Sequence, residues 1–153
     1  MSRRVVIKEL EPKAYEAMLG LEKYLSQTNL EASLKELIKI RVSQINGCAY
    51  CIDLHTKDAR KLGETEQRIY ALSAWRETPF FSQKERAVLA LAEEITFINH
   101  GVSDETYHKV AQVLDYHTLS QAIIAIITIN AWNRIAISTQ MQPVLDLAKK
   151  QVE

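Results

Sequence analysis

Two cysteines stand three positions apart, at Cys48 and Cys51, and His55 follows four positions after the second. An α-helix turns by about 100° per residue, so these three side chains would lie within about 60° of one another around a helix axis. Two thiols one turn apart can close a disulfide, and an imidazole next to a thiol can accept its proton. The spacing therefore predicts reversible thiol chemistry on one face of a helix.

A thiol attacks a peroxide or a disulfide only as the thiolate, and the pKa of free cysteine is near ~8.5. We expect the cysteines to begin the helix Cys48–Leu62, where the unpaired N–H groups would lower the thiol pKa, most strongly for Cys48. Glu36 lies one helix earlier. If the two helices form a hairpin around Asn46-Gly47, Glu36 orients His55 or relays its proton.

Two other interpretations of the cysteine pair stay open. Free cysteines are often inert apolar core residues. Two thiolates and an imidazole could also bind zinc, but a closed site needs a fourth ligand, and no second Cys-x-x-Cys occurs in the sequence. The other histidines, His100, His108 and His117, are expected to be solvated surface residues. We therefore expect neither a resident metal nor a cofactor.

The elements that must position these residues are predicted to be helices. Only four Gly and three Pro occur in 153 residues, and apolar side chains recur every three or four positions. This pattern predicts an all-α, single-domain bundle of about seven to eight helices over residues 1–153. The expected helices are Glu11–Gln27, Glu31–Ile45, Cys48–Leu62, Glu66–Arg76, Gln83–Asn99, Asp104–Leu114, Leu119–Ser138 and a short one after Pro143.

Helix starts are indicated by Pro12, Ser82 and Ser103, and Ser33 with Glu36 forms a capping-box pattern. The last long helix is apolar nearly all round, which predicts that other helices or a second subunit enclose it.

Several residues allow more than one role. Asn133-Arg134 follows the apolar helix, and an ion pair beside the active centre or at a subunit contact would explain it. Four aromatic residues at helical spacing are expected in the core rather than in a pocket. They are Trp75, Phe80, Phe81 and Trp132.

Composition and charge restrict where the protein acts. Nineteen Lys and Arg balance nineteen Asp and Glu, so no net charge attracts nucleic acid or an anionic membrane. The amino terminus has too few apolar residues for a signal peptide, and the most apolar stretch, Ala122–Ala131, is about half the ~20 residues needed to cross a bilayer. We expect a cytoplasmic protein, and a reducing cytosol favours a redox or metal role for the cysteines.

The pattern Glu36-x11-Cys48-x2-Cys51-x3-His55 resembles the alkylhydroperoxidase D-like branch of the carboxymuconolactone decarboxylase family. Other similar segments are the run Leu37–Leu72, Trp75, Lys84–Ala90 and Trp132-Asn133-Arg134. The resemblance implies an all-helical homo-oligomer, a trimer or hexamer, with the redox site near subunit contacts.

The resemblance also implies roles for the cysteines. Cys51 matches the thiol that attacks peroxide, and Cys48 matches the thiol that then closes the disulfide, which an external thiol reductant reopens. Local physics favours the opposite order, because Cys48 is nearer the helix start. Tyr50 stands where the best-studied relays of the family have a histidine; with a pKa near ~10, it is a poor base and at most an auxiliary.

The sequence thus predicts a thiol-dependent peroxidase that acts on an organic hydroperoxide. A disulfide reductase serving a partner peroxidase is the second hypothesis. A lactone decarboxylase-like enzyme is disfavoured, because the family's decarboxylases generally lack the cysteine pair. A non-catalytic helical oligomer is the hypothesis from a different class.

Overall fold

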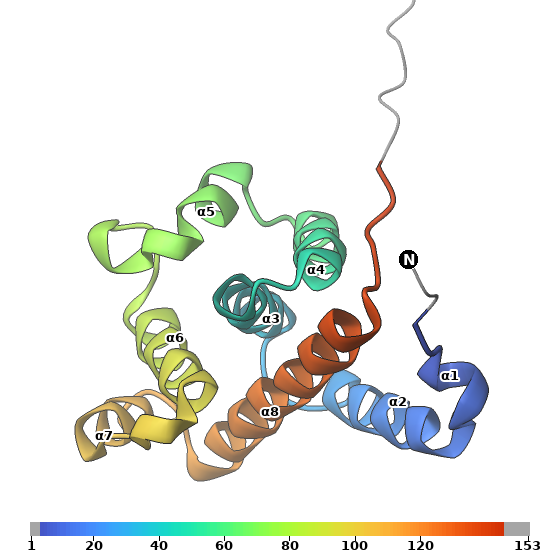
Figure 1. Cartoon of the computed structure of the whole chain (residues 1–153). Helices are drawn as coiled ribbons and strands as arrows, with labels where there is room; N and C mark the ends of the chain where they lie inside the picture. The colour runs from blue at the N-terminus through green and yellow to red at the C-terminus, as the bar shows by residue number, and fades with distance from the viewer. Residues whose placement is uncertain (1–3, 146–153) are drawn as a thin grey trace, which may run out of the picture.

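The computed structural model describes residues 4–145, which form eight α-helices and two short 3-10 helices with no strand among them (Figure 1). Their bounds are α1 Ile7–Leu10, α2 Pro12–Ser26, α3 Ala32–Asn46, α4 Ala49–Lys61, α5 Glu66–Ala71, η1 Leu72–Glu77, α6 Gln83–Thr96, η2 Ile98–His100, α7 Asp104–Ala111 and α8 Tyr116–Thr139. The predicted all-α class is confirmed. The short helix expected after Pro143 falls mainly on residues 146–153, outside the described residues.

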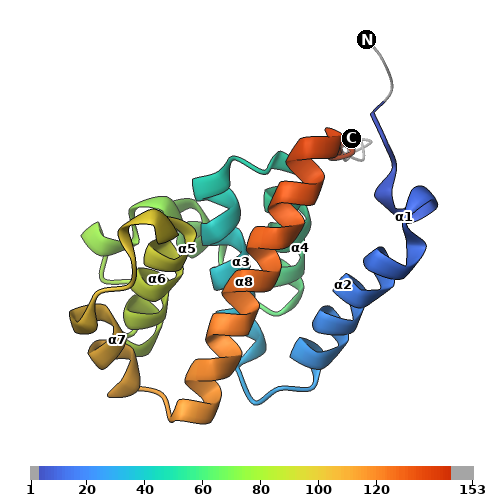
Figure 2. The ribbon, with the colours of Figure 1, turned by 60° about the horizontal axis from the view of Figure 1, so that its bottom comes forward.

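Helices α3 and α8 organise the fold. α3 packs against α4, α6 and α8, and α8 also contacts α2, α4, α6 and α7. Figures 1 and 2 show α1 and α2 on one side of α8, with α6 and α7 on the other. By length and composition α8 could cross a membrane, but the core helix of a soluble protein passes the same test, and here five helices pack against it. The predicted enclosure of the last long helix by other helices is confirmed in part, because ten of its 24 residues are buried while Ile127 and Ile137 stay exposed.

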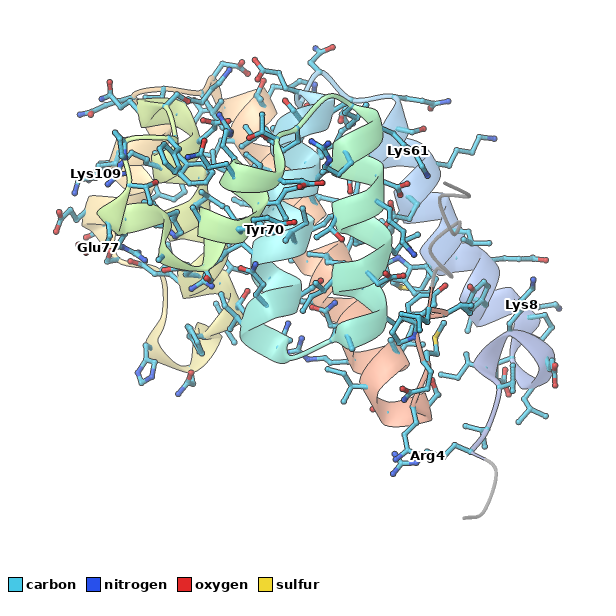
Figure 3. All side chains as sticks on the ribbon, turned by 90° about the horizontal axis from the view of Figure 1, so that it is seen from above. Arg4, Lys8, Lys61, Tyr70, Glu77 and Lys109 are labelled. Atoms are coloured by element: carbon cyan, nitrogen blue, oxygen red, sulfur yellow. The ribbon has the colours of Figure 1, made fainter. Side chains whose placement is uncertain are left out.

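The buried residues form two clusters. One lies between α3, α4 and α8 and contains both cysteines together with Ile38, Ile126 and Ile129. The other joins α3, η1 and α6 and contains Trp75 and Phe81, with Phe80 packed against it. These three aromatic residues confirm the core prediction. Charged side chains such as Lys8, Glu77 and Lys109 lie at the periphery (Figure 3), and Lys109 pairs there with Glu105 at 2.6 Å.

Most of the predicted helix starts are confirmed. Pro12 is the first residue of α2, Ser82 and Glu85 form a reciprocal capping box on α6, and Ser103 caps α7. Asp115 caps α8 through the N–H of Thr118, so α8 begins at Tyr116, earlier than expected.

The capping box expected for Ser33 and Glu36 is wrong. α3 begins at Ala32, and its N-cap, Glu31, makes no side-chain capping hydrogen bond. The carboxylate of Glu36 is instead bonded to His55 of α4. A tertiary contact has therefore replaced the local one.

The helix expected over Glu66–Arg76 is broken. α5 gives way to the 3-10 helix η1, within which Ala74 has non-helical angles, φ −119° and ψ 32°. The indole of Trp75 turns inward and donates to Glu93 Oε1 at 2.9 Å. The guanidinium of Arg86 donates to the Trp75 carbonyl at 2.9 Å. This carbonyl therefore has a hydrogen-bond partner without a further turn of α-helix to supply one.

Two other helices are shorter than expected. α6 ends at Thr96 rather than at Asn99, because Phe97 leaves the helical region and a 3-10 turn follows. α7 ends at Ala111 instead of Leu114. Helix ends fray into tighter turns, which periodicity alone cannot locate.

Candidate redox site

The cysteine pair lies at the start of α4. Gly47 ends α3 with a left-handed backbone, φ 71°, which glycine adopts without steric cost. The resulting turn makes Cys48 the N-cap of α4, and its Sγ accepts a hydrogen bond from the Cys51 N–H at 3.4 Å. Both residues are buried free thiols. The predicted placement of the pair at a helix N-terminus is confirmed.

The hairpin of α3 and α4 joins Glu36 to His55. Glu36 Oε2 lies 2.8 Å from His55 Nδ1, and both side chains are almost wholly buried. Since Nδ1 bonds to the carboxylate, Nε2 is the ring nitrogen left to act elsewhere. The contact expected between these residues is confirmed.

A buried lysine extends this pair, and the sequence reasoning missed it. Lys39 Nζ lies 3.5 Å from Glu36 Oε1 and 3.1 Å from Glu22 Oε2, so an ion-pair chain runs from α2 through α3 to His55. Both carboxylates of this chain pair with Lys39, because burying an unpaired carboxylate would be costly. The three-residue spacing of Glu36 and Lys39 weakly indicates an ion pair on one face of a helix, but it does not indicate that the pair is buried.

A pocket of about 300 Å³ opens onto this site. Cys51 and His55 both line it, whereas Cys48 does not and lies behind Cys51. The ring of Tyr15 from α2 meets that of Trp132 from α8 edge to face, with centroids 5.3 Å apart. The remaining lining residues are Leu19, Glu22, Lys39, Tyr50, Leu54, Asp58, Ala136 and Met141.

The pocket corrects the expectation for Trp132, which lines it while also packing against the first core cluster. Tyr50 and Cys51 both line the pocket. The expected ion pair of Arg134 beside the active centre is wrong, since Arg134 is exposed and donates to the Asn130 carbonyl and to its Oδ1. An ion pair at a subunit contact stays a prediction.

Burial controls the ionisation of Cys51. Desolvation, followed by a hydrogen bond with Cys48, raises the pKa of the Cys51 thiol to about 12, although a hydrogen bond with Asn133 acts in the opposite direction. The expectation that the helix start would lower the thiol pKa is therefore wrong for Cys51, because desolvation outweighs the helix dipole. Ionisation of this thiol needs a proton acceptor.

Asp58 is a further charged residue near His55. One ligand atom from each of Glu36, His55 and Asp58 lies within 4.8 Å of the others, a spacing that could hold a metal ion. Both carboxylates already form ion pairs with lysines: Lys39 Nζ lies 3.5 Å from Glu36, and Lys61 Nζ lies 2.7 Å from Asp58. Neither cysteine belongs to this group, so the described residues do not support a zinc site of two thiolates and an imidazole.

The three other histidines lie away from this site. They are exposed, which confirms the prediction that they are surface residues, namely His100, His108 and His117.

Comparison with known proteins identifies the family. The sequence pattern of the carboxymuconolactone decarboxylase family matches residues 12–94, which include α2 to α5, most of α6 and all four predicted site residues. The chain belongs to the carboxymuconolactone decarboxylase family. Within it, YdfG of Bacillus subtilis, an uncharacterised protein, is 50% identical over 139 residues, covering 90% of this chain and 95% of YdfG.

Solved structures agree with this assignment. A protein of unknown function from Agrobacterium tumefaciens, linked to AhpD-type antioxidant defence, superposes with a TM-score of 0.91 at 35% identity, covering 95% of this chain and all of the other. This protein is thus an AhpD-like member of the family. The debrominase Bmp8, with 2,3,4-tribromopyrrole bound, has a TM-score of 0.75 at 20% identity, covering 88% of this chain and 72% of Bmp8, which shows a shared fold alone.

Proposed function

We propose that the protein is a thiol-dependent peroxidase that reduces an organic hydroperoxide through Cys51 and Cys48. The observation that carries the proposal is the shared pocket: Cys51 opens into it beside His55, and Cys48 contacts Cys51 from behind. An attacking thiol must be reachable by substrate, whereas a resolving thiol needs only to reach the first sulfur. Accessibility therefore favours Cys51 as the nucleophile.

In the first step, the Cys51 thiol gives its proton to His55 as its sulfur attacks the terminal peroxide oxygen. An S–O bond forms and the O–O bond breaks, and the departing alkoxide takes the proton from His55 and leaves as an alcohol. Cys51 becomes a sulfenic acid. Cys48 sulfur then displaces its oxygen, so that an S–S bond forms and water leaves with the Cys48 proton.

Glu36 positions His55 in this scheme. A carboxylate 2.8 Å from Nδ1 holds the ring and stabilises the imidazolium that forms when His55 accepts the thiol proton. Lys39 and Glu22 keep the buried charge compensated during that transfer. Tyr50 is an auxiliary hydrogen-bond donor on the pocket wall.

The pocket wall suits an organic rather than an inorganic peroxide. Tyr15, Leu19, Trp132 and Met141 offer apolar surface for the carbon part of a hydroperoxide, next to the polar group around His55. An external thiol reductant then reopens the disulfide. We place this cycle in the cytoplasm, in a homo-oligomer of the trimer or hexamer kind that the family resemblance implies.

The test is stopped-flow reaction of the reduced protein with cumene hydroperoxide, followed by thiol counting. We expect both thiols to disappear much faster than free cysteine reacts. In the Cys48→Ser variant the sulfenic acid should persist and be trapped by dimedone, whereas Cys51→Ser should consume no peroxide. Full turnover by Cys51→Ser would overturn the assignment.

A second candidate is a disulfide reductase that serves a separate peroxidase. Two free thiols that contact each other at one pocket suit exchange with a partner's disulfide as well, and the raised pKa of Cys51, about 12, slows attack on a disulfide and on a peroxide alike unless His55 assists. Rapid exchange of the reduced protein with a partner's disulfide, with negligible direct consumption of cumene hydroperoxide, would support this candidate over the first.

A further inference from the structure

α3 and α8 are joined by hydrogen bonds between polar side chains that the proposed mechanism does not use. We call Asn46, Asn130 and Asn133 the asparagine chain. Asn133 is completely buried, and Asn130 is nearly so. Burying amides in an apolar core is unfavourable unless each donor and acceptor has a partner, so the partners reveal how each amide is oriented.

The orientation of Asn130 is set by a backbone group. Its Nδ2 donates to the carbonyl of Ile126 at 3.0 Å and to Thr96 Oγ1 at 3.1 Å. A backbone carbonyl can only accept, so this end of the amide must be the nitrogen. Asn130 Oδ1 therefore faces the other way, where Arg134 Nη1 donates to it at 2.9 Å.

This orientation passes along the chain. Asn46 Nδ2 lies 3.0 Å from Asn130 Oδ1 and 2.9 Å from Asn133 Oδ1, and it donates one hydrogen to each oxygen. Since Asn133 Oδ1 is thus an acceptor, its Nδ2 must lie at the opposite end of the amide. There it donates to Ser43 Oγ at 3.0 Å, which accounts for one of its two hydrogens.

The second hydrogen of Asn133 Nδ2 is left for Cys51. The Asn133 side chain acts on Cys51 as a hydrogen-bond donor would, in favour of the charged thiolate, and the Asn133 oxygen is already engaged by Asn46. We propose that Asn133 is a thiolate-binding residue, whose amide donor the asparagine chain holds toward the Cys51 sulfur. A fixed donor stabilises the negative charge on sulfur with little reorganisation at the moment of reaction.

The inference rests on the proposed function only for its effect on turnover, because thiolate binding can be measured without peroxide. The chain has two cysteines, so Cys51 is the only thiol in a Cys48→Ser protein. In that background, iodoacetamide alkylation is followed against pH for Asn133→Ala. We expect alkylation about tenfold slower at pH 8, with the profile moved about one unit toward alkaline pH, because the thiolate loses a hydrogen bond.

Thr128→Val is the matched control. Thr128 also lies on α8 and is completely buried, but its hydroxyl donates to the carbonyl of Ile124 within the same helix. This variant should alkylate like the Cys48→Ser parent. A folded Asn133→Ala protein with the parent's pH profile would overturn the inference.

A measurement without any Asn133 substitution covers the case in which that variant does not fold. In the Cys48→Ser protein, the side-chain amide NMR signal of Asn133 should move as Cys51 is titrated toward alkaline pH. A signal that does not move while Cys51 ionises would refute the inference. Asn133-dependent alkylation without peroxide consumption would instead keep this inference and reject the peroxidase.

Discussion

At the scale of single residues, the pKa of the Cys51 thiol is raised by burial and by Cys48 and lowered by Asn133. Burial and the neighbouring Cys48 raise its pKa to about 12, well above neutral pH. Only the thiolate is alkylated, so in the reduced protein the rate at Cys51 should rise about tenfold per pH unit from pH 7 to 10. Iodoacetamide labelling located by mass spectrometry checks this. A rate that levels off between pH 9 and 10, as for free cysteine with its pKa near ~8.5, would contradict it.

The role that we propose for Glu36, acting through His55, is testable on its own. Glu36→Gln keeps the shape of the side chain but removes the negative charge beside Nδ1, so the imidazolium formed during proton transfer loses its stabilising partner. We expect peroxide turnover to fall about 100-fold, with a changed pH profile of kcat/KM.

Asp53→Asn provides the control for Glu36→Gln. Asp53 also loses a charge, but it lies on the partly exposed side of α4, where it pairs with Lys57 at 3.0 Å. Turnover in this variant should match the unmodified protein. An equal loss in both variants would mean that Glu36 has no special role.

At the scale of the helices, the turn between α3 and α4 determines where the cysteines lie. A Cβ added at Gly47 would meet nothing within 4 Å, so Gly47→Ala reports the cost of its positive φ alone. We expect a loss of about 1 kcal/mol in the free energy of unfolding, measured with urea.

Gly20→Ala is the counterpart inside a helix. Gly20 lies within α2, and a Cβ there also meets nothing within 4 Å. Here alanine should stabilise the protein by about 0.5 to 1 kcal/mol, because the backbone is already helical. Two substitutions of the same kind should therefore change stability in opposite directions. The same sign for both would show that backbone conformation is not what distinguishes them.

At the scale of the whole molecule, α8 is enclosed on most sides, but Ile127 and Ile137 stay exposed. Ile127 lines an apolar cleft of about 600 Å³ together with Leu91, Ile95 and Ile123. Exposed apolar surface of this kind favours the homo-oligomer that we propose. Light scattering should give a mass several times 17.5 kDa, and Ile127→Arg should lower it toward that value. A single-chain mass for the unmodified protein would reject the oligomer.

The helices were predictable because their signals are local. Apolar spacing, Pro12 and the serine caps located most of them, and the relative positions of Cys48, Cys51 and His55 follow from the geometry of one helix. The prediction failed at η1, where the burial of Trp75 against Glu93 ended a helix that periodicity would have continued. At such places a tertiary contact overrides the helical preference of the local sequence.

The sequence by itself determined the helical class and the cysteine pair at a helix start, and it indicated Glu36 and His55 as partners on the condition that their helices form a hairpin. Only the tertiary structure decided that Lys39 is buried beside Glu36, that Trp132 lines the pocket and that the Asn133 side chain acts on the pKa of Cys51. It also reversed the expected shift of the Cys51 pKa. The physical reason is that desolvation and amide orientation depend on residues far along the chain, which helical spacing cannot bring together.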